Sequence, residues 1–292
     1  LANGIIFAGV SIGAGIAPPM IVYLITNHGW HSAFYGSAGI GVIVLGLWLM
    51  IVRDRPEQHP WVKPEEAAYI AAGVSVAKAG AKPASWLAIL RNRPVALLTL
   101  SYFTYGYVAW IFFTWFFKYL SSVRGLDLKS SAFYGMLPFI MMAICSPLGG
   151  WLSDVLTPRY GKRVGRCWTA AAALALCAVF VAVATQAADA RVASLFLAGG
   201  AGALYLSQSA FWTLSADIGG HSSGSVSGLM NMGNQIGGVI TASLTPIIAD
   251  KFGWTASFVF AAALLVVGAI AWLFVDPDKQ LVTEDAPEAA AA

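Results

Sequence analysis

Long apolar stretches alternate with short polar turns along almost the whole chain. Eight stretches of 20 or more mainly apolar residues can be marked, at about 4–26, 30–52, 95–119, 131–156, 167–187, 192–216, 222–249 and 255–275. At about 1.5 Å per residue, an α-helix of this length crosses roughly 30 Å of hydrocarbon. The pattern therefore predicts an all-α, polytopic membrane protein with eight transmembrane helices.

The first two and the last two of these stretches resemble two copies of one unit. Each copy has a Gly-rich apolar helix, a polar turn that ends in Gly-Trp, and a second apolar helix. With a shift of 224 residues the matching positions are Gly4 and Gly228, Gly9 and Gly233, Gly13 and Gly237, Gly29-Trp30 and Gly253-Trp254, Phe34 and Phe258, and Trp48 and Trp272. Chance recurrence is the alternative, since Gly makes up 30 of 292 residues. Six matches at one offset favour a duplication.

The composition agrees with a membrane protein. Hydrophobic residues make up 58% of the chain and charged residues 11%, and the mean hydropathy is +0.71. A soluble domain needs far more polar surface. The net charge of +3 is too small to indicate nucleic-acid binding, so the expected environment is the lipid bilayer.

The basic residues indicate orientation. Of the 17 Lys and Arg residues, 12 lie between the second and third stretches, between the fourth and fifth, or in the tail. By the positive-inside rule these segments are cytoplasmic, in a plasma (inner) membrane. The predicted organisation is two helices in 1–52, a cytoplasmic linker in 53–94 with a short helix from Pro64 to about Gly73, six helices in 95–276, and a disordered cytoplasmic tail in 277–292.

Ionisable side chains are nearly absent from the apolar stretches. Apart from Lys118, no Asp, Glu, Lys, Arg or His lies well inside any of them. A hydrolase in the membrane would need a carboxylate pair, a Ser/His arrangement or a metal cluster. We therefore expect no enzyme activity, no metal site and no cofactor.

Uncharged polar residues provide the candidate sites. Asn231, Asn234 and Gln235 form one stripe along a helix, either as a wall that faces a substrate or as hydrogen-bonding groups between helices. Ser209 and Trp212 share a face beside further hydroxyl groups, which suits a pocket. Tyr102 and Tyr105, also three apart, are comparable candidates.

Several motifs resemble those of the major facilitator superfamily. Gly150-Trp151-Leu152-Ser153-Asp154, continuing through Gly161-Lys162-Arg163 after extra residues, is similar to the superfamily's loop motif. Four further segments are similar to the anion:cation symporter family, whose members carry hexonates, hexuronates, tartrate or phthalate. They are Arg53-Asp54-Arg55-Pro56-Glu57-Gln58-His59-Pro60, Phe113-Thr114-Trp115-Phe116, Trp212-Thr213-Leu214-Ser215-Ala216-Asp217 and Asn231-Met232-Gly233-Asn234.

The resemblance implies a bundle of twelve helices in two halves, of which this chain supplies helices five to twelve. From the repeat, roughly 120–130 residues are then expected before residue 1. It also implies a secondary transporter for a small organic anion such as a sugar acid or other carboxylate, coupled to protons through residues in the absent helices. It places Tyr102, Ser209, Trp212 and Asn231 in the substrate pocket.

Asp154 and the basic loop that contains Arg159, Lys162 and Arg163 are expected to act in gating. Charges at this cytoplasmic helix end can pair across the two halves and favour an outward-open state. Two other interpretations of the function stay open. In these, the protein is either a non-transporting sensor or scaffold on a transporter fold, or an inactive fragment of a transporter.

Overall fold

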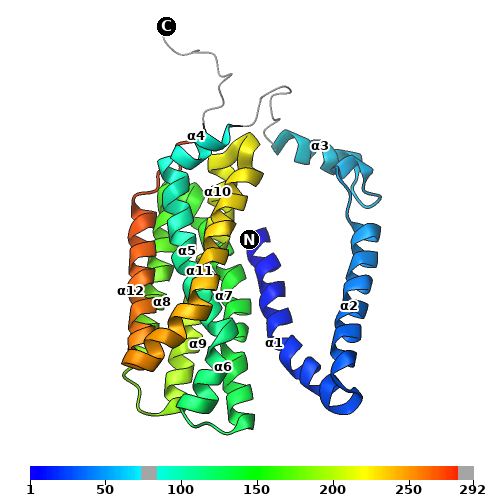
Figure 1. Ribbon diagram of the computed structural model, residues 1–292. Coiled ribbons are helices and arrows are strands. Elements are labelled where there is room, and N and C mark those ends of the chain that lie inside the picture. Colours follow the sequence, from blue (N-terminus) through cyan, green and yellow to red (C-terminus); the bar gives the residue numbers. More distant parts are fainter. Residues whose placement is uncertain (74–83, 282–292) are drawn as a thin grey trace. The chain divides into compact units, whose positions relative to one another are not determined.

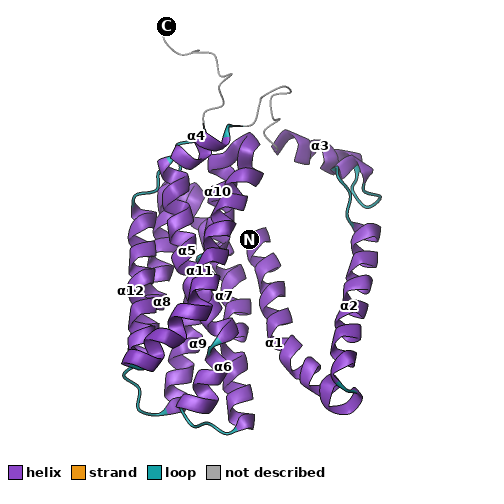
Figure 2. Ribbon diagram, viewed as in Figure 1, coloured by secondary structure: helices purple, strands orange, loops and turns teal. Residues whose placement is uncertain are grey.

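The computed structural model describes residues 1–73 and 84–281, and in these ranges every regular element is a helix (Figures 1 and 2). The chain forms two compact units. One consists of Leu1–Gly15 with Lys82–Ala292, and the other of Ile16–Ala81. Most of the predicted disordered tail, residues 282–292, lies outside the described residues.

The helix boundaries follow local capping signals. Asn92 accepts a hydrogen bond from the Val95 amide at 3.1 Å at the start of one long helix, and Asp189 accepts from two backbone amides at the start of another. These two N–H groups lower the pKa of the exposed Asp189 carboxyl. The helices are α1 (Ala2–His28), α2 (Trp30–Ile51), α3 (Pro64–Gly73), α4 (Trp86–Arg91), α5 (Arg93–Thr114), α6 (Phe116–Lys118), α7 (Leu128–Lys162), α8 (Thr169–Ala184), α9 (Ala190–Leu206), α10 (Gln208–Gly219), α11 (Ser223–Phe252) and α12 (Trp254–Leu273).

Six stretches of the described residues are long and apolar enough to cross a membrane. They are α1, α2, α5, Ser130–Ala184, Ala190–Phe252 and α12. The stretches of 55 and 63 residues each contain more than one helix. Length and apolar content therefore do not give the number of membrane crossings, and eight transmembrane helices stays a prediction. The all-helical architecture with several apolar spans agrees with the sequence pattern.

The two copies of the repeated unit share a backbone conformation at their turns. Gly29 has φ 80° and ψ 163°, and Gly253 has φ 86° and ψ 160°. The Gly29 amide donates to the Ile25 carbonyl at 3.0 Å, and the Gly253 amide donates to the Ala249 carbonyl at 2.9 Å. A positive φ strains residues that carry a side chain, which explains why glycine stands at both turns.

In the unit that contains Lys82–Ala292, α5 and α11 pack closely through glycines (Figure 1). A Cβ atom added at Gly233 would lie 2.8 Å from the Thr99 carbonyl oxygen, and one at Gly237 would lie 2.4 Å from the Phe103 carbonyl oxygen. Such distances leave no room for a methyl group. In a lipid bilayer the hydrophobic effect does not drive helices together, and small residues instead let two helix backbones pack closely.

Hydroxyl groups add hydrogen bonds between the same helices. The Thr241 hydroxyl on α11 donates to the Tyr107 carbonyl on α5 at 2.6 Å, and the Tyr107 hydroxyl lies 3.0 Å from the Thr245 hydroxyl. Ser101 on α5 donates to the Gly268 carbonyl on α12 at 3.0 Å. These contacts fix the rotation of α5, and therefore decide which of its side chains face α10.

The unit Ile16–Ala81 contains the C-terminal part of α1, then α2 and α3. The predicted short helix is present as α3, with Glu65 and Glu66 in its first turn, where carboxylates face the positive end of the helix dipole. Within this unit, nearly all side chains of α2 are exposed, as expected for a helix that contacts lipid or further helices.

Candidate functional site

The centre of the candidate site is the buried hydroxyl group of Tyr102 on α5. It accepts a hydrogen bond from Gln208 Nε2 at 2.9 Å and another from Trp212 Nε1 at 3.1 Å. Gln208 and Trp212 are four residues apart on α10, so both lie on the face that meets α5. We refer to Tyr102, Gln208 and Trp212 as the amide–aromatic cluster.

Aromatic rings hold this cluster in place. Tyr105 stacks on Tyr102 with ring centroids 5.1 Å apart, and Phe211 lies 4.5 Å from the Tyr102 ring. Trp272 of α12 packs behind Phe211 at 4.9 Å. Trp212 crosses the Tyr102 ring at 90°. Packed rings of this kind restrict side-chain rotation, so the Tyr102 hydroxyl has a fixed position.

Trp212 is the least buried member of the cluster. Tyr102 is 1% exposed and Gln208 is 2% exposed, whereas Trp212 is half-buried. Its other side contacts Phe7 of α1, with ring centroids 5.7 Å apart. Near this contact the Asn3 amide donates to the Thr213 hydroxyl at 3.3 Å. The first residues of α1 therefore contact α10 on the Trp212 side.

Ser209 turns away from Tyr102. Its side chain is 2% exposed, and its hydroxyl has no hydrogen-bond partner among residues 1–73 and 84–281. A Cβ atom added at Gly150 of α7 would lie 2.9 Å from the Ser209 hydroxyl. Ser209 therefore faces α7, about 100° around the helix from Gln208.

The predicted amide stripe on α11 has three different environments. Asn234 packs against Gly106 of α5, where an added Cβ would lie 2.2 Å from Asn234 Oδ1, and this oxygen is buried without a partner in the described part of the chain. Gln235 is exposed, and Asn231 is half-buried. No hydrogen bond among the described residues joins Asn231 to Tyr102 or Trp212.

The residues with predicted gating roles lie in the C-terminal part of α7 and in the segment that follows it. Gly161 interrupts the helix with φ 82°, and the π-helical segment Arg163–Trp168 follows. Asp217 near the C-terminal end of α10 forms ion pairs with Arg166 and, at 3.5 Å, with Lys162 Nζ. These pairs join the basic loop to α10.

The other predicted gating residues have different surroundings. Arg163 donates to the Leu273 carbonyl at the end of α12 at 3.4 Å, and Arg159 is exposed. Asp154 is also exposed and contacts the Leu1 amino group. Pairing of these residues across the two halves stays a prediction, because both ion pairs of Asp217 lie within 95–276.

Two residues were missing from the predicted site. Gln208 could have been found from its spacing, since an amide four residues before Trp212 shares its face. Asp217 could have been found as an acidic residue at a helix end near a basic loop. Sequence alone did not show which helix either residue would contact.

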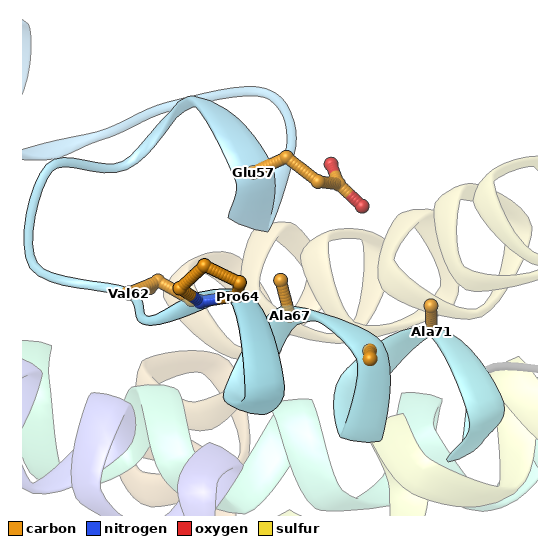
Figure 3. A pocket seen from close by; sticks show the side chains of 6 residues that line it. Glu57, Val62, Pro64, Ala67 and Ala71 are labelled. Carbon is orange, nitrogen blue, oxygen red and sulfur yellow. The ribbon is translucent and has the colours of Figure 1, made fainter.

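No group of three or more His, Cys, Asp or Glu residues within residues 1–73 and 84–281 has metal-binding geometry. A hollow of about 350 Å³ lies in the linker region, beside α3 (Figure 3). Its lining is Glu57, Val62, Pro64, Ala67, Ala68 and Ala71. Glu57 is the one ionisable side chain in this lining, so the hollow lacks the converging polar groups typical of a ligand site.

Comparison with known proteins gives one matching family and a set of similar transporters. The model of the Major Facilitator Superfamily matches residues 1–242 and 159–291. The chain is 32% identical to a probable sulfoacetate transporter of Cupriavidus necator, over 98% of this chain and 66% of that protein. It is 27% identical to a hexuronate transporter of Bacillus subtilis, over 94% of this chain and 64% of that protein. A probable L-galactonate transporter of Escherichia coli is 23% identical, over 93% of this chain and 60% of its own length. The chain thus spans about half to two thirds of the length of the curated relatives it matches.

Proposed function

Since this chain belongs to the Major Facilitator Superfamily, we propose that it is part of a secondary transporter that moves a small organic anion across the membrane. The family match confirms that the chain belongs to a family of transporters and not of enzymes. The protein is a multi-pass membrane protein. We place it in the plasma (inner) membrane, with the linker 53–94 and the C-terminus in the cytoplasm, on the basis of its Lys and Arg distribution.

The amide–aromatic cluster is the observation that supports this proposal. A hydrogen-bonded group of the buried Tyr102 and Gln208 and the half-buried Trp212 lies between α5 and α10. Polar groups in a membrane interior cost free energy unless they are paired, and they usually mark a ligand pathway. Transporters of this kind bind their substrates near the membrane midplane, between two repeats that rock against each other.

We assign the substrate contacts of this half to Trp212 and Asn231, with Ser209, Tyr102 and Tyr105 as supporting residues. None of these side chains is charged. In this proposal they contact the uncharged part of the anion, while the cationic groups and the proton-coupling carboxylates lie on helices outside this chain. The proposed organisation is two helices of one half in 1–52 and six helices of the other half in 95–276, eight in all.

Uptake measurements test the transport proposal. The protein, expressed from its complete gene in cells that lack sugar-acid uptake, should accumulate at least one of labelled glucuronate, galactonate or sulfoacetate. An uncoupler that removes the proton gradient should lower that accumulation. A protein that binds one of these anions but carries none of them would instead be a sensor on a transporter fold. Cells with an empty vector provide the background.

We also propose that Asp154 and the basic residues Arg159, Lys162 and Arg163 control the balance between inward-open and outward-open states. The contact of Lys162 and Arg166 with Asp217 supports this proposal, because it ties the basic loop to the helix that carries Trp212.

The Asp217→Asn variant tests this gating role. It should change the ratio of inward-open to outward-open states by about fivefold, equivalent to roughly 1 kcal/mol, since it leaves Arg166 facing a neutral amide. Cysteine accessibility from each side of the membrane measures the ratio. Asp250→Asn is the matched control, because Asp250 is exposed at the end of α11. If Asp217→Asn and Asp154→Asn both leave the ratio unchanged, the gating proposal is wrong.

A further inference from the structure

Gln208 has hydrogen-bonding capacity that the described part of the chain does not use. It is the first residue of α10, directly after Ser207, which separates α9 from α10. Its side chain is 2% exposed, and its Nε2 donates to the Tyr102 hydroxyl. Its Oε1 is buried and has no hydrogen-bond partner among residues 1–73 and 84–281. A buried amide oxygen without a partner is uncommon and calls for an explanation.

Counting donors and acceptors shows what kind of group would satisfy the cluster. The Tyr102 oxygen accepts two hydrogen bonds, so its own O–H remains free to donate. Gln208 keeps one N–H and both lone pairs of Oε1. If the amide turns over, Oε1 can accept from Tyr102, and both N–H groups of Gln208 are then free. In either orientation, part of the Gln208 amide is left unpaired.

A hydroxyl group fits both orientations because it donates and accepts at once. It can donate to Oε1 while accepting from Tyr102, or accept from the free N–H of the turned amide. A carboxylate or sulfonate oxygen only accepts, and it would leave Oε1 unpaired in the first orientation. Among residues 1–73 and 84–281, the hydrogen bonds and ring contacts of the cluster include no charged side chain, so none of these partners would neutralise an anionic group.

From this geometry we propose that Gln208 is a specificity-determining residue that, together with Tyr102, binds a hydroxyl group of the transported anion. The proposal rests on the transport function proposed above and narrows its substrate to hydroxylated acids. In this proposal Gln208 binds an uncharged group of the substrate, and other residues bind its charged end.

Trp212 covers this subsite in the structure. Its N–H occupies one acceptor position of the Tyr102 oxygen, and its ring meets the Tyr102 ring edge-on at 90° and contacts Phe7. In this proposal, the indole moves aside to let a hydroxyl group reach Gln208. Substrate entry then breaks the Trp212 hydrogen bond to Tyr102 and gives the Gln208 amide the partner that it lacks among the described residues.

Competition between matched anions tests the proposal. In the complete protein, uptake of labelled glucuronate is measured against unlabelled glucuronate and against its monodeoxy analogues. For the wild type, at least one deoxy analogue should compete about tenfold less well than glucuronate, as expected when one hydrogen bond to a buried amide is lost. In Gln208→Met, which keeps the volume and removes the amide, this difference should disappear. Gln186→Met, at an exposed glutamine after α8, should keep it.

Other outcomes distinguish this inference from the transport proposal. If Gln208→Met still discriminates against the deoxy analogue as the wild type does, Gln208 does not bind the hydroxyl group. The proposal that the protein is a transporter is not affected by this outcome. If the wild type carries sulfoacetate but no hydroxylated acid, the hydroxyl assignment is overturned and the transport function again stands. Where Gln208→Met does not fold, Tyr102→Phe takes its place, since it removes one partner of the same hydroxyl and should also reduce the discrimination.

Discussion

The Gly237→Ala variant is expected to unfold more easily than the wild-type protein, by about 1–3 kcal/mol. The added methyl group would lie 2.4 Å from the Phe103 carbonyl oxygen and 2.8 Å from the Tyr107 amide nitrogen. Both atoms belong to the backbone of α5, which cannot move aside as a flexible side chain can. The two helices must therefore separate, and the hydrogen bond from Thr241 to the Tyr107 carbonyl would lengthen with them.

A matched glycine on the same helix separates this packing effect from helix propensity. Among the described residues, no atom outside the adjoining backbone of α11 lies within 4 Å of a Cβ added at Gly228. Alanine favours a helix over glycine by about 1 kcal/mol, so Gly228→Ala should leave stability unchanged or raise it. Unfolding of the purified protein in detergent, by heat or by a denaturing detergent, measures both variants. Equal stability of Gly237→Ala and Gly228→Ala would show that α5 and α11 do not pack through Gly237.

The Trp212→Ala variant should raise the KM for transported anion by about thirtyfold or more, the effect of losing roughly 2 kcal/mol of binding free energy. The substitution removes the indole N–H that donates to Tyr102 and the ring that lies between Tyr102 and Phe7. Initial uptake rates over a range of substrate concentrations measure the KM. The amount of folded protein in the membrane must be measured in parallel.

Two variants identify the cause of this effect. Trp212→Phe keeps an aromatic ring and loses the N–H, so it should raise the KM by a smaller factor than Trp212→Ala. Trp168→Ala removes an indole that is 54% exposed in the segment before α8, and it should leave the KM unchanged. If Trp212→Ala transports with wild-type KM and rate, Trp212 does not contact the substrate, and the proposed site is wrong.

The all-helical architecture could be predicted from the sequence because helices and their ends depend largely on neighbouring residues. Asn92 and Asp189 cap their helices through bonds that span two or three residues. The repeated Gly-Trp turn also follows from local geometry, since Gly29 and Gly253 both adopt a positive φ. The short helix at Pro64 was likewise predicted from its Pro and acidic first turn.

The candidate site was predicted less completely because its contacts join distant parts of the chain. Tyr102 and Trp212 were both chosen from their residue types and positions, but the hydrogen bond between them was not predicted. Gln208 was not selected, although it shares the contact with Tyr102. Asn231 and Asn234 were placed on one stripe, yet Asn234 faces a glycine of α5 and Asn231 does not.

The sequence by itself determined that this is an all-helical membrane protein with a repeated unit, and its motifs indicated the family. Length, apolar content and the position of glycine and charge are sufficient for those conclusions, because a helix in lipid must satisfy its own backbone hydrogen bonds. Only the tertiary structure decided which polar groups meet. The Gly237 contact with α5 sets how closely α5 and α11 approach. The hydroxyl groups of α5 and α11, one of which donates to a carbonyl of α12, set the rotation that turns Tyr102 toward Gln208 and Trp212.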